Sequence, residues 1–506
     1  MAQPASEAKS SGPTLSRELG LWDGTMLVAG SMIGSGIFIV AADIVAQTGS
    51  AGWLLATWVI TGALTVFAAL SFGQLATRIP HTGGQYAYLR ELYGPLFGFL
   101  YGWTYFVVIN TGSAAAVAVG FARYLGVLVP WISPDKDLIA PIRLGEKYAI
   151  TLNAQQFVAI ASIVFLTWIN SRGLKLGRLI QSTFTSAKAL ALVALIGVGL
   201  TIGYNADVVA ANFHDLWTPR GPMPLKPGLG FLPELTASMG LIGLLVALGV
   251  AQVGSLFSAD AWNSVTFTAG EVKDPRRTVR LALIWGTVVV TALYLLANLA
   301  YLVVLPLDGI RNAPDSRVAT AVLQQIWGPA GATVMAVAIV VSTFGCNNGL
   351  LLSGARVYYA MALDGSFFRK VGTLNKARVP GVALWLQCVW ACVLVLPRVV
   401  KADGSYDNLY NTLLNYVIFA TLIFYVMTVA GLYKVRLQEQ RKPVPGVQPV
   451  SLLLPTLYCI AATGILLVLL TYQTDTTWPG LILVLLGVPV FYLWGGKTAP
   501  APQAES

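Results

Sequence analysis

The chain has 506 residues, of which 56% are hydrophobic and 11% are charged, and its mean hydropathy is +0.70. Soluble globular domains carry about 25% charged residues, so this composition excludes that class and indicates a polytopic membrane protein. The formal net charge of +10 does not indicate a nucleic-acid partner, because the basic residues gather in loops on one side of the predicted spans.

Apolar stretches of about 18 to 25 residues predict an all-α chain with twelve transmembrane helices. In chain order, these are 21–48, 52–77, 96–126, 153–170, 178–203, 235–268, 279–305, 328–362, 380–397, 407–434, 449–472 and 478–495. An even number of spans puts both termini on one side. With cytosolic termini, the inner loops carry 20 Lys and Arg residues and the outer loops carry 9. This asymmetry is typical of a multi-pass cell-membrane protein.

The first predicted helix contains the run G-S-M-I-G-S-G-I-F at 30–38. Glycine and serine propagate a helix poorly, and irregular backbone at membrane depth is tolerated where it lines a cavity. The run therefore predicts an unwound segment at a binding site. There, Ser35, Gly36 and Ile37 would offer free amides to a carboxylate, and Met32 would offer a carbonyl to an ammonium group.

The sixth predicted helix is interrupted by G-S-L-F-S-A-D-A-W-N at 254–263. Two breaks that are five spans apart indicate a transporter built from two five-helix repeats of inverted topology, with its site between the breaks. Phe257, Ser258 and Ala259 would add carbonyls for the ammonium group of a zwitterion. The alternative for each run taken alone is that its small residues pack against a neighbouring helix.

Five motifs in this order resemble the amino acid–polyamine–organocation (APC) superfamily and, within it, the L-type amino acid transporter (LAT) family. They are G-S-M-I-G-S-G-I-F (30–38), I-P-H-T-G-G-Q-Y-A-Y-L-R (79–90), F-S-A-D-A-W-N (257–263), E-V-K-D-P-R-R (271–277), and S-T-F-G-C-N-N-G (342–349) with A-R-V-Y-Y-A-M-A-L-D-G (355–365). The resemblance extends over residues 21–436. It implies the LeuT-type fold, a 5+5 inverted repeat with discontinuous helices 1 and 6, and sodium-independent amino acid transport, commonly by obligatory exchange.

The resemblance also implies roles for single residues. The family's unwound segment, which holds the substrate backbone, is matched by Ser31, Met32, Ile33, Gly34, Ser35 and Gly36, and its helix 6 break by Ser258, Ala259 and Asp260, which Asn263 follows. Together with Ile37 and Phe257, these are the residues that we predict to bind the substrate. Phe257 matches the aromatic gate that closes over the substrate. Asp260 and Ala261 stand at positions where glycine occurs in the family. The resemblance therefore does not determine which substrate side chain the site accepts. Asp260 either compensates a local helix dipole or contacts the substrate or gate.

Lys188 is the only charged residue near the middle of the fifth predicted helix, and an ionisable residue inside a membrane indicates a functional site. It resembles the lysine that replaces a sodium ion in sodium-independent members. In that role its ammonium would bridge helix 1 near Gly34 and helix 8 near Ser342. A proton carrier and a purely structural lysine are the alternatives.

Polar residues within apolar helices are further candidates. Ser113, Asn263 and Asn415 would either line the pocket or form interhelical hydrogen bonds. The expected organisation is a cytosolic tail at 1–20, repeats at 21–203 and 204–434, helices 11 and 12 at 435–495, and a cytosolic tail at 496–506.

We therefore predict a sodium-independent secondary transporter of small neutral L-amino acids that works by alternating access and exchange. One alternative is a proton-coupled symporter that uses Lys188. A different class, an amino acid sensor or a channel, would need no paired gates. The chain contains no nucleophile–His–acid spacing and no phosphate-binding loop, so we expect no enzyme activity, and we expect neither a cofactor nor a metal.

The expected partners are an amino acid substrate and the lipid bilayer. Eukaryotic members of the family join a glycoprotein through a cysteine in the loop after helix 3. The corresponding loop, 127–152, contains no cysteine. We therefore expect no disulfide-linked heavy subunit, as in a bacterial-type protein that acts alone.

Overall fold

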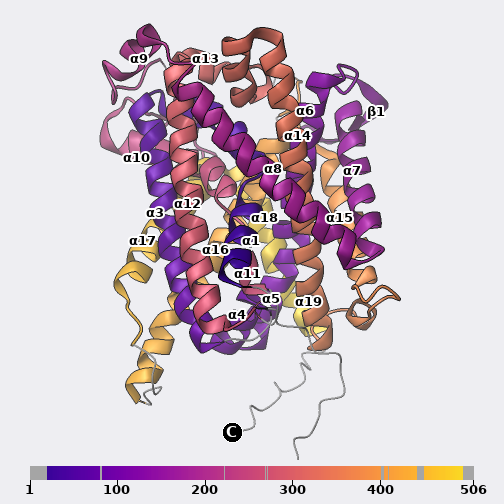
Figure 1. Cartoon of the computed structure of the whole chain (residues 1–506). Coiled ribbons are helices and arrows are strands. Elements are labelled where there is room, and N and C mark those ends of the chain that lie inside the picture. Colours follow the sequence, from indigo (N-terminus) through magenta and orange to yellow (C-terminus); the bar gives the residue numbers. More distant parts are fainter. Residues whose placement is uncertain are drawn as a thin grey trace, which may run out of the picture.

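The computed structural model describes residues 20–79, 83–221, 223–267, 269, 272–400, 404–407, 409–441 and 449–493, and it omits the side chains of 174–182 and 224. The predicted tail 496–506, and all of the predicted tail 1–20 except its last residue, lie outside this part. The described chain is a bundle of long helices (Figure 1). Within it, ten helices are long and apolar enough to cross a membrane.

The predicted break in the first helix is present. Helix α1 spans Leu21–Met32, a 3₁₀ turn η1 spans Gly36–Phe38, and α2 spans Ala41–Thr48. The chain leaves the helix at Ile33, which has extended backbone angles (φ −70°, ψ 94°). The glycines and serines that follow do not restore the α-helix before α2, as their low propensity predicts.

The second predicted break is also present. Helix α10 spans Gly240–Ser258, and a short helix α11 spans Ser264–Phe267. Between them, Ala261 has φ +62°, a left-handed conformation that L residues with a side chain adopt at a cost of roughly 1–2 kcal/mol. The sequence thus places an alanine where the backbone favours glycine.

The remaining helices follow the predicted spans closely. They are α3 (Ala51–Arg78), α5 (Pro95–Thr104) with η2 (Tyr105–Ile109) and α6 (Asn110–Leu128), α7 (Ala154–Ser171), α8 (Leu174–Leu200), α12 (Pro275–Val304), α14 (Val318–Leu363), α15 (Gly381–Val395), α16 (Leu409–Arg441), α17 (Leu453–Tyr472), α18 (Thr474–Leu485) and α19 (Gly487–Leu493). Helix α14 begins ten residues before the predicted start at 328. Its first part is separated by a kink at Gly328, because the next residue is Pro329.

Shorter elements connect these helices and were not predicted from the sequence. At one end of the bundle lies α4 (Gln85–Tyr93), and at the other lie α9 (Ala206–Phe213) and α13 (Leu307–Arg311) (Figure 1). The loop 127–152 forms a hairpin of β1 (Asp137–Leu144) and β2 (Tyr148–Asn153), which β5 extends. The other short elements are β3 (Pro224–Leu225), β4 (Leu235–Thr236), β5 (Pro397–Val399), η4 (Pro314–Ser316) and η5 (Arg369–Gly372). We call the two ends the α4 end and the α13 end.

Candidate functional site

The break after α1 exposes the carbonyl groups of the last helical turn, which have no partner along a helix that stops. The Ile33 N–H closes the last turn by donating to Ala29 O (3.0 Å). Other parts of the protein pair with the carbonyls that follow. Lys188 of α8, whose side chain is fully buried, donates its Nζ–H to Gly30 O. Cys346 Sγ of α14 lies 3.8 Å from the next carbonyl oxygen, that of Ser31.

The last carbonyl of α1 is bound by a tyrosine that sequence reasoning missed. The Tyr294 hydroxyl of α12 lies 2.9 Å from Met32 O and 3.0 Å from Ser258 O, the carbonyl at the end of α10. One hydroxyl therefore joins the two breaks. Two of the carbonyls predicted for an ammonium group thus lie within about 6 Å of each other, because both are within hydrogen-bonding distance of one oxygen.

The opposite side of the first break carries amides. The Phe38 N–H donates to Ser35 O (3.1 Å), so the amides of Ser35, Gly36 and Ile37 precede the first donor of η1 and have no acceptor within that turn. Glycine is required at 36, because a Cβ there would lie 2.8 Å from the Cβ of Ser258. The backbone of the first break therefore packs directly against Ser258 of the second break.

A cavity, here called the break pocket, lies between the two breaks. The predicted residues that line it are Ser31, Met32, Gly34, Ser35, Gly36, Phe257, Ser258 and Asp260. The other four predicted residues lie elsewhere. The side chains of Ile33 and Ile37 are buried in the apolar core, where they anchor the unwound segment. Ala259 lines a neighbouring cavity between α3 and α16, and Asn263 lines the pocket described below.

Phe257 covers the break pocket toward the α13 end. Its ring meets that of Tyr410 of α16 edge-on, with 6.1 Å between centroids. The Tyr410 hydroxyl is 3.0 Å from Ser35 Oγ, so both breaks touch the same tyrosine. The guanidinium of Arg123 (α6) lies 5.4 Å from the centroid of the Tyr410 ring. Phe257 and Tyr410 thus form a layer of aromatic side chains on this side of the pocket.

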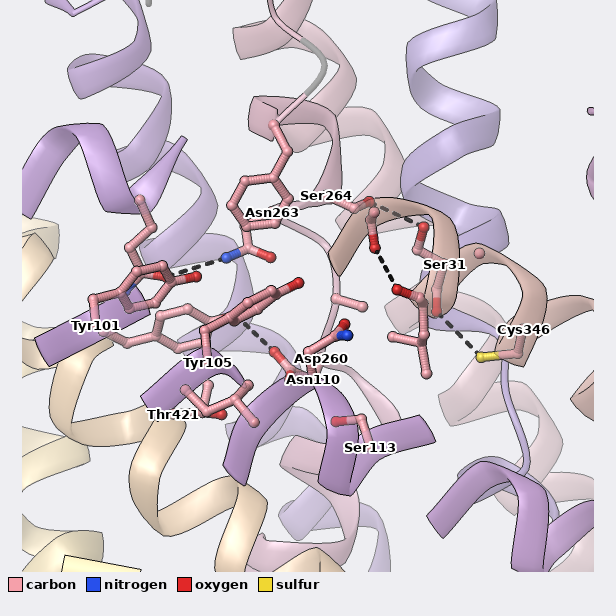
Figure 2. A pocket seen from close by; sticks show the side chains of 18 residues that line it. Ser31, Tyr101, Tyr105, Asn110, Ser113, Asp260, Asn263, Ser264, Cys346 and Thr421 are labelled. Atoms are coloured by element: carbon pink, nitrogen blue, oxygen red, sulfur yellow. Dashed lines mark hydrogen bonds between the residues drawn. The ribbon is translucent and has the colours of Figure 1, made fainter. Parts of the chain in front are cut away.

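A second cavity, here called the side pocket, continues from the break pocket toward α5 and α6 (Figure 2). Asp260 lies between the two cavities and lines both, and its Oδ1 accepts a hydrogen bond from the Tyr425 hydroxyl (2.6 Å). Asn110 Oδ1 and Thr421 Oγ1 also line the side pocket and are buried without a hydrogen-bond partner in the described part of the chain. A buried polar group left unpaired costs about 1–3 kcal/mol, so these atoms favour a ligand that forms hydrogen bonds.

The comparisons with known proteins agree with this geometry. The amino acid permease family model matches residues 19–491. The chain belongs to the amino acid permease family. It is also 28% identical to the human large neutral amino acids transporter small subunit 2 over 493 residues, which cover 97% of this chain and 83% of that protein.

Two further relatives of this permease are similar to the same degree. The human Asc-type amino acid transporter 1 is 28% identical over 488 residues, covering 96% of this chain and 84% of the relative. The mouse b(0,+)-type amino acid transporter 1 is 28% identical over 455 residues, covering 89% and 83%. The family and these relatives place the permease in the APC superfamily with LAT-type homologues, all of them transporters rather than enzymes.

In the permease, Lys188 contacts the first break one turn before the expected position. Its hydrogen bond goes to Gly30 O rather than to Gly34, because α1 continues to Met32 and its free carbonyls begin near Gly30. Ser342, the other expected partner, has a buried Oγ without a hydrogen-bond partner among the described residues. Lys188 therefore holds the carbonyl end of α1.

Proposed function

We propose that the permease is a sodium-independent transporter of small neutral L-amino acids that exchanges one amino acid for another by alternating access. The observation that carries this proposal is the break pocket itself. Ser35 and Gly36, whose amides have no acceptor within η1, line this pocket together with Met32 and Ser258, whose carbonyls share the Tyr294 hydroxyl. Amides and carbonyls at one pocket would suit the two charges of a zwitterion. The name of one relative, a large neutral amino acids transporter, supports a neutral amino acid as the substrate. The name of the Asc-type relative supports an amino acid substrate.

In this proposal, the substrate carboxylate binds the amides of Ser35, Gly36 and Ile37. Its ammonium group binds the carbonyls beside Tyr294, and its side chain points past Asp260 into the side pocket. Phe257 acts as the gate. The polar atoms of the side pocket could form hydrogen bonds with a small polar substrate side chain. They therefore favour serine as a substrate in addition to alanine.

The proposed architecture has twelve crossings. Ten long helices, the broken α1–η1–α2 segment and the 15-residue helix α15 account for them. We propose the inverted repeats 21–203 and 204–434, followed by 435–495, with the second boundary falling inside α16. The positive-inside bias supports cytosolic termini, with the α13 end on the outside.

Lys188 would take the structural place of a sodium ion, since its ammonium joins α8 to the carbonyl end of α1. Its burial also supports a second candidate, a proton-coupled symporter in which this lysine exchanges a proton.

Uptake of labelled alanine, serine and leucine into proteoliposomes in sodium-free buffer tests the proposal. We expect uptake of alanine and serine that does not change when sodium is added. Uptake that requires sodium would refute the role of Lys188 as a sodium substitute. Uptake that appears only with an inward pH gradient would favour the symporter.

A further inference from the structure

A separate cavity lies on the α13 side of the layer formed by Phe257 and Tyr410. Its walls come from α2, α10, the start of α16 and the residue before α18. We call it the outer vestibule. Its polar lining residues are Asp43, Gln47, Asp407, Asn411, Asn415 and Gln473. Its volume is about 220 Å³, against about 40 Å³ for the break pocket. The outer vestibule therefore offers more room for a hydrated molecule than the break pocket does.

The position of the outer vestibule is fixed by residues next to the gate. Val253 and Gly254, which line it, precede Phe257 by about one helical turn on α10. Asn411 follows Tyr410 directly on α16. The outer vestibule therefore lies about one helical turn from the gate residue, close enough for a molecule in it to reach the break pocket once Phe257 moves.

The chemistry of the outer vestibule favours an ammonium group. Asp43 lies within hydrogen-bonding reach of Asn411 and interacts electrostatically with Asp407, a like charge, and with Arg123. Arg123 does not line the cavity. Its Nη1–H donates to the backbone oxygen of Asp315 (3.2 Å), and its guanidinium lies on the Tyr410 ring. The charged side chains that line the cavity are the carboxylates of Asp43 and Asp407. Asp407 already has a cationic neighbour, because Arg398 interacts with it electrostatically and donates from Nη2–H to its backbone oxygen (2.8 Å).

One further atom independently indicates a missing donor. Asn411 Oδ1 is buried and has no hydrogen-bond partner in the described part of the chain, although it belongs to a residue that lines the cavity. An ammonium group has three N–H donors. The Asp43 carboxylate and Asn411 Oδ1 are acceptors for such a group in the lining of the cavity, and the side-chain amides of Gln47, Asn415 and Gln473 remain for a carboxylate.

We propose that the outer vestibule is a second binding site, which holds an amino acid by its ammonium group before the gate opens. The site raises the concentration of substrate next to Phe257 and removes part of its hydration shell. This proposal rests on the proposed function, because it assumes that the permease carries amino acids and that the α13 end faces outward.

Binding stoichiometry tests this inference. Labelled alanine is titrated onto the purified full chain in nanodiscs, with the Asp43→Asn variant beside it. Asp207→Asn is the matched control, since it removes an exposed carboxylate on α9 that does not line the cavity. We expect two bound alanine molecules in the wild type and the control, and one in Asp43→Asn. Charge-assisted hydrogen bonds of this kind correspond to about 10- to 100-fold in affinity.

The outcomes separate the two proposals. One alanine in the wild type, or two in Asp43→Asn, overturns the second site and leaves the proposed function intact. No bound alanine in the wild type refutes the proposed function. The molecule retained by Asp43→Asn shows that this variant is folded. Alanine methyl ester, which keeps the ammonium group, should displace the second alanine, whereas N-acetylalanine should not. Equal displacement by both compounds overturns recognition through the ammonium group.

Discussion

Lys188 offers the sharpest test of how the first break is held. The Lys188→Met substitution keeps the length of the side chain and removes the donor to Gly30 O. The lost hydrogen bond and the unpaired carbonyl cost about 1–3 kcal/mol. Removing a charge from the membrane interior recovers about 2.5–3.5 kcal/mol. Because the two terms oppose each other, we expect the free energy of unfolding to change by no more than about 2.5 kcal/mol.

Transport should respond far more strongly than stability. Without Lys188, the carbonyl end of α1 loses its link to α8, and the amides of the break lose their fixed position. A charge-assisted hydrogen bond of about 1.5–3 kcal/mol corresponds to a 10- to 100-fold lower exchange rate.

The assay is alanine exchange in proteoliposomes, combined with thermal unfolding of the purified variant. Lys226→Met is the control, since this lysine is exposed in the loop before α10. A folded Lys188→Met protein that exchanges alanine at the wild-type rate would refute the reasoning.

Three other substitutions test neighbouring parts of the site. Gly36→Ala puts a methyl group 2.8 Å from Ser258 Cβ, so we expect at least a 10-fold loss of alanine exchange, and exchange at the wild-type rate would contradict the close packing of the breaks. Ala261→Gly relieves a φ of +62° and should raise the free energy of unfolding by about 0.5–1 kcal/mol, whereas a lower value in denaturant titration would argue against strain at this position. Thr421→Val removes an unpaired hydroxyl from the side pocket and should lower serine uptake relative to alanine, and an unchanged ratio would exclude this hydroxyl from substrate recognition.

Both helix breaks could be predicted because their cause is local. The glycines and serines at 30–36 weaken the helix where they stand, and apolar length alone located the spans. Lys188 was recognisable for a similar reason, since one charge in an apolar helix is informative without knowledge of its neighbours. Its contact at Gly30 rather than Gly34 depended on where α1 ends.

Other features depend on residues far apart in the chain. In the sequence, Tyr294 resembles an ordinary aromatic residue of the apolar core. Its hydroxyl reaches the carbonyls of Met32 and Ser258 only because α12 lies beside both breaks in the fold. The direction in which the Asn110 side chain points depends on the π-helical turn Tyr105–Ile109 just before it. Such a turn rotates the residues that follow relative to a regular α-helix, and a sequence rarely reveals it. The outer vestibule likewise combines segments that start near residues 43, 250 and 407.

Counterflow measures the central claim most directly. Proteoliposomes loaded with unlabelled alanine and empty proteoliposomes are given labelled alanine in sodium-free buffer without a pH gradient. If an amino acid must occupy the break pocket for the protein to change sides, the label accumulates in the loaded vesicles and stays near background in the empty ones. Equal uptake into both would contradict exchange through the break pocket.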